Sequence, residues 1–205
     1  TVDADGNVAT MLEIDGQPSG LGWLPDGNLL LVSMLDRQVL RLDDGELVIH
    51  ADLSAVAEFH CNDMVVDASG RAYVGHFGFD LMSGAPVRTA SIVIVEPDGS
   101  ARVGADGLLF PNGMALLDGG STLIVAESFG NKITAYDVSA SGELTNRKTW
   151  AAFGPQPTST ERIGSMGSQP VHRITSAAII AASEPSVWNG PNATPRNAMS
   201  GPDAP

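Results

Sequence analysis

Four side chains that can do chemistry follow one another in the run HCNDMVVDASGR (60–71): His60, Cys61, Asn62 and Asp63. A thiol beside an imidazole could be a nucleophile and its base, and His60, Cys61 and the nearby His76 could also ligate zinc. A carboxamide oxygen beside a carboxylate suits a hard cation such as Ca²⁺ or Mg²⁺. Which chemistry is available depends on the elements that aim these side chains.

Short apolar runs rich in Val, Leu and Ile, separated by turn residues, fill the first 150 residues. The turns read DADG, LPDGN, DDGE, DASGR, EPDGS and LDGGS. This pattern predicts an all-β chain of many short antiparallel strands. Neighbouring side chains of a strand point to opposite faces, and no close Cys-x-x-Cys or His-x-x-x-His pair exists. We therefore expect Cys61 to be a buried structural thiol.

The strands repeat as a unit of four. SGLGWLPDGNLLLVS (19–33), CNDMVVDASGRAYVG (61–75) and PNGMALLDGGSTLIVAES (111–128) align, and a second hairpin follows each of them at 38–50, 91–104 and 132–150. Four strands in about 40–50 residues is the size of a β-propeller blade. The opening TVDADGNVATMLEI resembles the outer hairpin of an earlier blade. We expect a partial propeller of about three and a half blades, with an open solenoid or a sandwich as the alternative.

The first strand of each blade lines the central channel of a propeller. Asn62 and Asn112 fall at the same position of neighbouring repeats, where the first repeat has Gly20 to Gly22. The two carboxamides should converge on the axis as ligands of a divalent cation. Trp23 and Phe110 are expected in the core, and HFGFD (76–80) either covers the channel mouth or packs between blades.

HCNDMVVDASGRAYVG and LLFPNGMALLDGGSTLIVAESFGNKITAYDV, followed by GELTNRKTW, resemble the senescence marker protein/gluconolactonase (regucalcin-like) family over about residues 1–153. The resemblance implies a six-bladed propeller with one axial divalent metal, most often Ca²⁺, with Zn²⁺ or Mn²⁺ as alternatives. It implies hydrolysis of sugar lactones or related esters. Asn112 matches a metal ligand, and Asn62 matches a residue that contacts substrate or a metal-bound water. His60 stands where some members have a substrate-contacting Arg, and Glu127 lies near the mouth by register.

Two carboxylates of the family pattern are not found. One is the Glu of an early EGP-type motif, and the other is the Asp of a fifth-blade PDG motif that serves as metal ligand and base. PDG at 25–27 and at 97–99 are strand turns. The catalytic residue is therefore unknown, and we expect little or no lactonase activity from this chain. A non-catalytic binding module and a non-functional fragment are the competing interpretations.

Composition limits the partners. The formal net charge is −13, which argues against nucleic acid and anionic membranes as partners. No run approaches the ~18 apolar residues of a membrane span, and a single cysteine fits the cytoplasm. We expect a small-molecule lactone or ester as ligand, and self-association through unpaired blade faces. Residues 1–153 should form the propeller. Residues 154–205 should be an irregular tail, either disordered or the product of a reading-frame shift.

Overall fold

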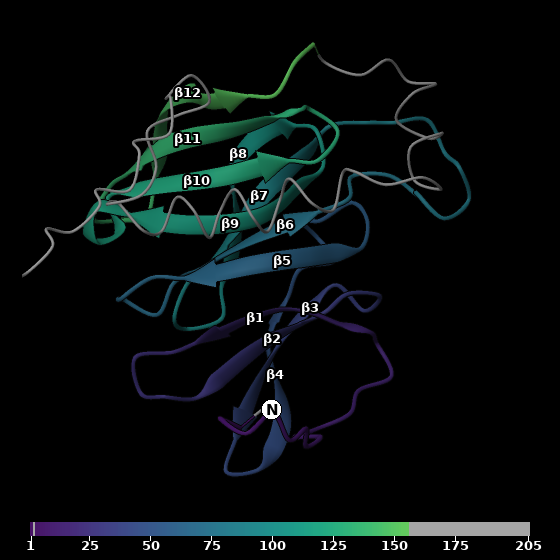
Figure 1. Ribbon diagram of the computed structural model, residues 1–205, viewed down its shortest axis with the longest axis vertical. Helices are drawn as coiled ribbons and strands as arrows, with labels where there is room; N and C mark the ends of the chain where they lie inside the picture. Colours follow the sequence, from purple (N-terminus) through teal and green to yellow (C-terminus); the bar gives the residue numbers. More distant parts are fainter. Residues whose placement is uncertain (2, 156–205) are drawn as a thin grey trace, which may run out of the picture.

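The computed structural model describes residue 1 and residues 3–155. They form three antiparallel sheets of four strands each, ordered β1-β2-β3-β4, β5-β6-β7-β8 and β9-β10-β11-β12 (Figure 1). The chain is thus an all-β partial propeller, as its sequence repeat predicts. The predicted tail lies outside the described residues, apart from its first two positions. No helix in the described part is long and apolar enough to cross a membrane.

The strand bounds follow the predicted hairpins closely. The first sheet holds β1 (Pro18–Trp23), β2 (Leu29–Ser33), β3 (Gln38–Asp43) and β4 (Glu46–Asp52). The second holds β5 (Cys61–Val66), β6 (Ala72–His76), β7 (Ala90–Val95) and β8 (Ala101–Leu108). The third holds β9 (Pro111–Leu117), β10 (Thr122–Glu127), β11 (Lys132–Val138) and β12 (Leu144–Ala152), with a single 3₁₀ turn at Asp118–Gly120.

Side chains alternate between the two faces of each strand, and those of the second sheet fill the space on either side of it. Val93 and Val95 of β7 pack toward the first sheet with Leu30 and Val32. Ile92 and Ile94 of β7 pack toward the third sheet. All six residues of β7 are buried, because this strand has an apolar layer on both sides. The inner strands β1, β5 and β9 lie side by side and bring their N-terminal ends together (Figure 1).

The predicted earlier hairpin is present only as a short turn among the described residues. Ala9 N–H donates to Thr1 O (2.9 Å) and Asp3 N–H to Asn7 O (3.1 Å), but no strand forms before β1. Within the described part, one face of β1 therefore has no neighbouring sheet, and Trp23 is 62% exposed. The prediction that Trp23 belongs to the core is wrong, whereas Phe110 is buried as predicted.

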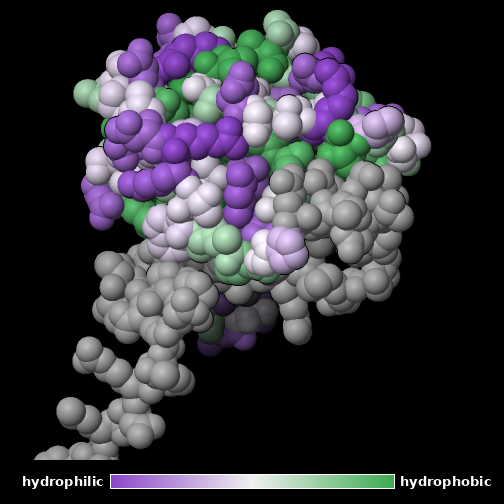
Figure 2. Space-filling model, turned by 90° about the horizontal axis from the view of Figure 1, so that it is seen from above, coloured by the Kyte–Doolittle hydropathy of each residue, from purple (hydrophilic) through white to green (hydrophobic). Residues whose placement is uncertain are grey.

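The opposite edge of the described part is polar. β12 exposes Thr145 to Thr149, a run that includes Arg147 and Lys148. Figure 2 looks onto the β12 end of the molecule, where purple hydrophilic side chains lie among pale and green ones. Charged side chains on an outer strand discourage pairing with another chain.

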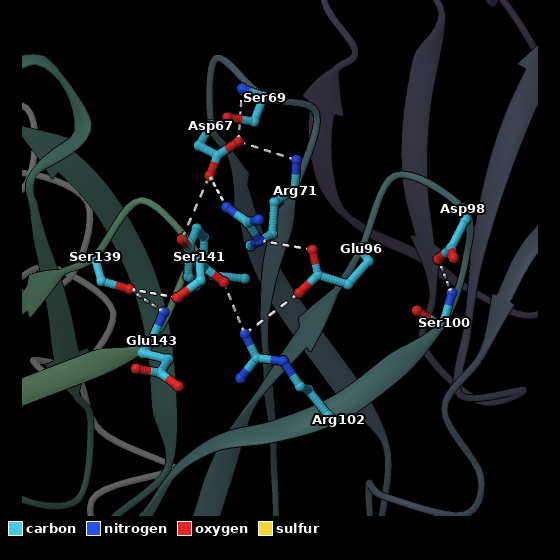
Figure 3. A network of polar contacts seen from close by, with 11 residues as sticks. Asp67, Ser69, Arg71, Glu96, Asp98, Ser100, Arg102, Ser139, Ser141 and Glu143 are labelled. Atoms are coloured by element: carbon cyan, nitrogen blue, oxygen red, sulfur yellow. Dashed lines mark hydrogen bonds and ion pairs between the residues drawn. The ribbon is translucent and has the colours of Figure 1, made fainter.

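A polar network joins the second and third sheets at the turns between their strands (Figure 3). Arg71 pairs with Asp67 (3.1 Å) and with Glu96 (2.8 Å). Arg102 pairs with Glu96 (3.3 Å) and donates to Ser141 O (3.1 Å) across the sheets. Asp67 follows the C-terminal end of β5, so the network lies at the end of the blades opposite to Asn62.

Candidate functional site

Each inner strand carries a β-bulge at the same place. At each bulge, two residues of the inner strand lie opposite one residue of the second strand. The bulges lie between Pro18 and Leu21 of β1, between Cys61 and Met64 of β5, and between Pro111 and Met114 of β9. The two residues at the bulge are Ser19–Gly20, Asn62–Asp63 and Asn112–Gly113. The register confirms that Asn62 and Asn112 occupy equivalent positions. A bulge re-aims side chains and is common beside functional sites.

Asn62 is 4% exposed, and only the nitrogen of its carboxamide makes a hydrogen bond within the described residues. Its Nδ2 donates to Pro111 O at 2.9 Å, which ties β5 to the start of β9. Its Oδ1 is buried and has no hydrogen-bond partner among the residues that the structure describes. A Cβ on Gly75 would lie 2.5 Å from both Asn62 Oδ1 and Pro111 O, so only glycine allows this approach. Since buried polar atoms are almost always paired, the orphaned oxygen is what a cation or a hydrogen-bond donor of a ligand would satisfy.

Asn112 presents its carboxamide from the next inner strand. Its Nδ2 donates to Ser128 Oγ at 3.2 Å. Its Oδ1 makes no hydrogen bond within the described residues, so it too can ligate a cation. Two neutral oxygen donors from neighbouring strands therefore stand at the same end of the sheets.

Asp63 brings a carboxylate to the β5 bulge, and the family motifs assign it no role of its own. It is half-buried at the β5 bulge, and no hydrogen bond or ion pair within the described residues engages its carboxylate. Burial raises its pKa. A carboxylate without a counter-charge can accept a proton or ligate a cation. Its place directly after Asn62 was the available signal.

His60 and Cys61 do not act as a pair. The His60 ring stacks on Phe59 with centroids 4.1 Å apart, and its Nδ1 is buried without a partner. Burial lowers the pKa of His60, so the ring is neutral at pH 7. Cys61 is fully buried, and burial raises the pKa of its thiol to about 12. This confirms Cys61 as a structural thiol. The described residues hold no group of three or more His, Cys, Asp and Glu suited to a metal, so the zinc alternative gains no support.

Glu127 ends β10 and is 2% exposed. Its carboxylate accepts hydrogen bonds from Leu109 N (2.8 Å) and Thr134 Oγ1 (2.5 Å), and it pairs with Lys132 (3.3 Å) and Arg147 (3.4 Å). The bond to Leu109 fixes the chain that enters β9. Leu109 lies three residues before Asn112, and contact of Glu127 with substrate stays a prediction.

A buried polar residue recurs at the end of the second strand of each sheet, a pattern that sequence reasoning missed. These residues are Ser33, His76 and Glu127. Ser33 Oγ donates to Asp36 (2.6 Å), and His76 Nε2 accepts from Ser91 N–H (3.1 Å). Burial lowers the pKa of His76 to about 4. The aligned endings LVS, VGH and VAE could have revealed the position, but not the partners.

Solved structures with similar folds include three enzymes or candidate enzymes. A luciferin-regenerating enzyme is 19% identical, with a TM-score of 0.56 over 69% of this chain and 49% of its own. A candidate gluconolactonase is 18% identical, with a TM-score of 0.60 over 74% and 55%. Virginiamycin B lyase from Staphylococcus aureus is 16% identical, with a TM-score of 0.52 over 72% and 46%. These identities establish a common fold and nothing finer.

The chain spans about half the length of these structures. A search of curated proteins returned no match. The sequence profile of one family, described as SMP-30/gluconolactonase/LRE-like region, matches residues 1–179. The match extends past residue 153, where the resemblance read from the motifs ends. The chain therefore belongs to the SMP-30/gluconolactonase/LRE-like family.

Proposed function

We propose that this chain carries the site of a divalent-metal-dependent hydrolase of sugar lactones or related esters. The observation that carries the proposal is the orphaned, buried Oδ1 of Asn62, at a bulge that the neighbouring blade repeats with Asn112. Family membership supports the same activity.

The donor atoms fit a hard cation, with Ca²⁺ the first choice and Zn²⁺ or Mn²⁺ the alternatives. Asn62 and Asn112 would hold it through carboxamide oxygens, and Asp63 would add the one charged ligand or act beside it. When bound, a divalent cation stabilises negative charge on a carbonyl oxygen. Ca²⁺ takes about 6–8 oxygens, more than these three side chains supply. We therefore expect weak metal binding and little turnover by the 205-residue chain.

The protein's own residues would move the proton. Water adds to the acyl carbon while Asp63, whose carboxylate has no partner among the described residues, accepts a proton from it. The bond from the acyl carbon to the ring oxygen then breaks, and the proton passes from Asp63 to the departing oxygen, which gives a hydroxy acid. His60, neutral and half-buried at the rim, would contact the rest of the substrate.

Acid release from glucono-δ-lactone tests the proposal. After subtraction of the spontaneous rate measured without protein, we expect slow hydrolysis that 1 mM Ca²⁺, Mn²⁺ or Zn²⁺ stimulates and a chelator abolishes. Asn62→Ala and Asp63→Asn should remove the stimulated rate, whereas the exposed Asn7→Ala should keep it. Hydrolysis that ignores the chelator and both site variants would refute the proposal. Rapid turnover would refute the expected shortage of ligands.

A non-catalytic binding module is the second candidate. The shortage of charged ligands favours it, since Asp63 is the one carboxylate at the described bulges of the inner strands β1, β5 and β9. Thermal unfolding separates the two, because a ligand that binds only the native state raises its stability. A cation site predicts a higher melting temperature with added Ca²⁺ that Asn62→Ala removes. No shift with any of the three cations favours the module.

We also propose that the chain acts in the cytoplasm, on small molecules and without nucleic acid or membranes as partners. Its net charge of −13 and its single cysteine support this. The exposed face of β1 supports the further proposal that the chain self-associates.

A further inference from the structure

Aromatic side chains surround the segments that enter and leave the candidate site. Phe110 precedes β9, Phe77 follows β6, and Phe129 lies two residues after β10. Centroids are 4.5 Å apart between Phe77 and Phe110, and 4.8 Å apart between Phe110 and Phe129. Phe79 lies at the edge of these rings, 6.4 Å from Phe110 and 6.0 Å from Phe129. We call these four buried residues the phenylalanine cluster: Phe77, Phe79, Phe110 and Phe129.

The phenylalanine cluster adjoins the polar donors of the site. Phe110 is bonded to Pro111, whose carbonyl accepts the hydrogen bond from Asn62 Nδ2 (2.9 Å). The His60 ring lies 5.9 Å from Phe77. A molecule whose carbonyl reaches Asn62 and Asn112 would therefore lie beside an apolar surface.

The segment 80–89, between β6 and β7, covers this surface. Leu81, Ala85 and Val87 are partly buried against the cluster, while Met82 is 74% exposed. The segment folds on itself, with Ala85 N–H donating to Asp80 O (3.0 Å).

An ion pair between Arg88 and Glu58 (3.2 Å) joins the segment 80–89 to the chain before β5, and both side chains are more than half exposed. Exposed pairs contribute about 0–1 kcal/mol. The cover is held mainly by apolar contacts, which an apolar ligand can replace.

This surface suits some substituents better than others. The hydroxyls of a sugar lactone lose hydrogen bonds to water when they are buried against phenylalanine rings. An alkyl or aryl group gains free energy in the same place. We propose, on the basis of the proposed function, that the preferred substrates are lactones or esters with an apolar alkyl or aryl substituent. The substituent lies on the phenylalanine cluster in place of the apolar side chains of 80–89.

A binding experiment tests this without requiring turnover. The ketone 3-pentylcyclohexanone has the ring and chain of δ-decalactone, with a methylene in place of the ring oxygen, so it cannot be hydrolysed. Its affinity for the whole chain is compared with that of cyclohexanone by calorimetry. Each buried methylene adds about fourfold in affinity, and re-exposure of the displaced apolar side chains of 80–89 cancels part of this gain. We therefore expect the pentyl compound to bind about 30-fold more tightly rather than the ~1,000-fold that five methylenes alone would give. Equal affinities, or no binding of either ketone, would overturn the inference.

Variants locate the binding surface. Phe79→Leu and Phe129→Leu should each lower the affinity ratio by about fivefold or more, because they remove part of the apolar contact. Phe153→Leu is the matched control, since Phe153 packs in a different cluster against β9–β12, and it should leave the ratio unchanged. Melting temperatures identify any variant that fails to fold, and the other variant then decides. A ratio that the two cluster variants do not change would overturn the inference.

Hydrolysis of δ-decalactone and glucono-δ-lactone separates this inference from the proposed function. Faster metal-dependent hydrolysis of δ-decalactone supports both. Tight binding of the pentyl ketone without hydrolysis of either lactone refutes the proposed function and keeps the apolar site. Hydrolysis of glucono-δ-lactone alone keeps the function and overturns the inference.

Discussion

Acid should destabilise the fold through His76. This ring is 2% exposed, and burial lowers its pKa from 6.5 to about 4. Ser91 N–H donates to Nε2 (3.1 Å), so the neutral ring carries its proton on Nδ1, which has no partner. The unfolded chain binds a proton below pH 6.5, whereas the native ring stays neutral until about pH 4. The free energy of unfolding is therefore unaffected by His76 above pH 6.5, and it decreases as the pH falls below that value.

The size of the effect follows from the two pKa values. The loss of unfolding free energy is about 2 kcal/mol at pH 5 and about 3 kcal/mol at pH 4. Urea titrations followed by tryptophan fluorescence, with chelator present, measure it. His76→Gln is the comparison, because the amide can still accept the Ser91 N–H but does not titrate.

The comparison isolates His76 from other titrating groups. Burial also lowers the pKa of His50 and His60, and it raises that of Asp63, which acts in the opposite sense. These contributions cancel between the wild type and His76→Gln. Between pH 7.5 and pH 5 the wild type should lose about 2 kcal/mol more than the variant. Equal losses in the two proteins would refute the reasoning.

Four further outcomes are expected. Asn112→Asp should tighten Ca²⁺ binding at least about tenfold, because a full charge ~4 Å from a divalent ion gains about 2 kcal/mol even in water; calorimetry measures it. Glu127→Gln should cost about 2–4 kcal/mol in urea unfolding, since it leaves buried donors and two cations without their carboxylate. Cys61 should react with a thiol reagent at pH 8 about 10³-fold more slowly than a free thiol, and normally in urea. Trp23→Arg or Ile49→Arg should reduce self-association in sedimentation, because both side chains are 62% exposed on the face of the first sheet that no other described sheet covers.

Matched variants serve as controls. Asn131→Asp should leave Ca²⁺ affinity unchanged, and Glu58→Gln, at an exposed pair, should change stability by less than about 0.5 kcal/mol. Met82→Arg should leave self-association as it is, because Met82 lies on a different surface. Equal effects of a variant and its control would contradict the corresponding prediction, as would fast labelling of native Cys61.

The blades were predictable because their determinants are local. Turn sequences such as DASGR place a glycine at positive φ, as at Gly70 (φ 84°), and an aspartate that accepts backbone N–H groups, as Asp67 does. Apolar runs between such turns can only pair as antiparallel strands. The equivalence of Asn62 and Asn112 came from the same repeat.

The missed features depend on contacts between distant residues. Glu127 takes its partners from β11, from β12 and from the segment before β9, so no local pattern reveals that its charge is enclosed. The phenylalanine cluster gathers side chains from three loops. Trp23 was assigned to the core from its repeat position, but burial depends on the neighbouring sheet as well as on the strand itself.

The bulges of β1, β5 and β9 allow the residues of the candidate site to be substituted during evolution without loss of the fold. Residues inside a bulge lie outside the regular ladder, so replacing them leaves strand pairing intact. Ser19–Gly20, Asn62–Asp63 and Asn112–Gly113 are three different solutions at one backbone position. A Cβ on Gly20 would lie 2.4 Å from the backbone nitrogen of Met64, so the position that each blade can vary is the first residue of the bulge: Ser19, Asn62 or Asn112. Ligand preference could drift one blade at a time over evolution while the scaffold stays constant.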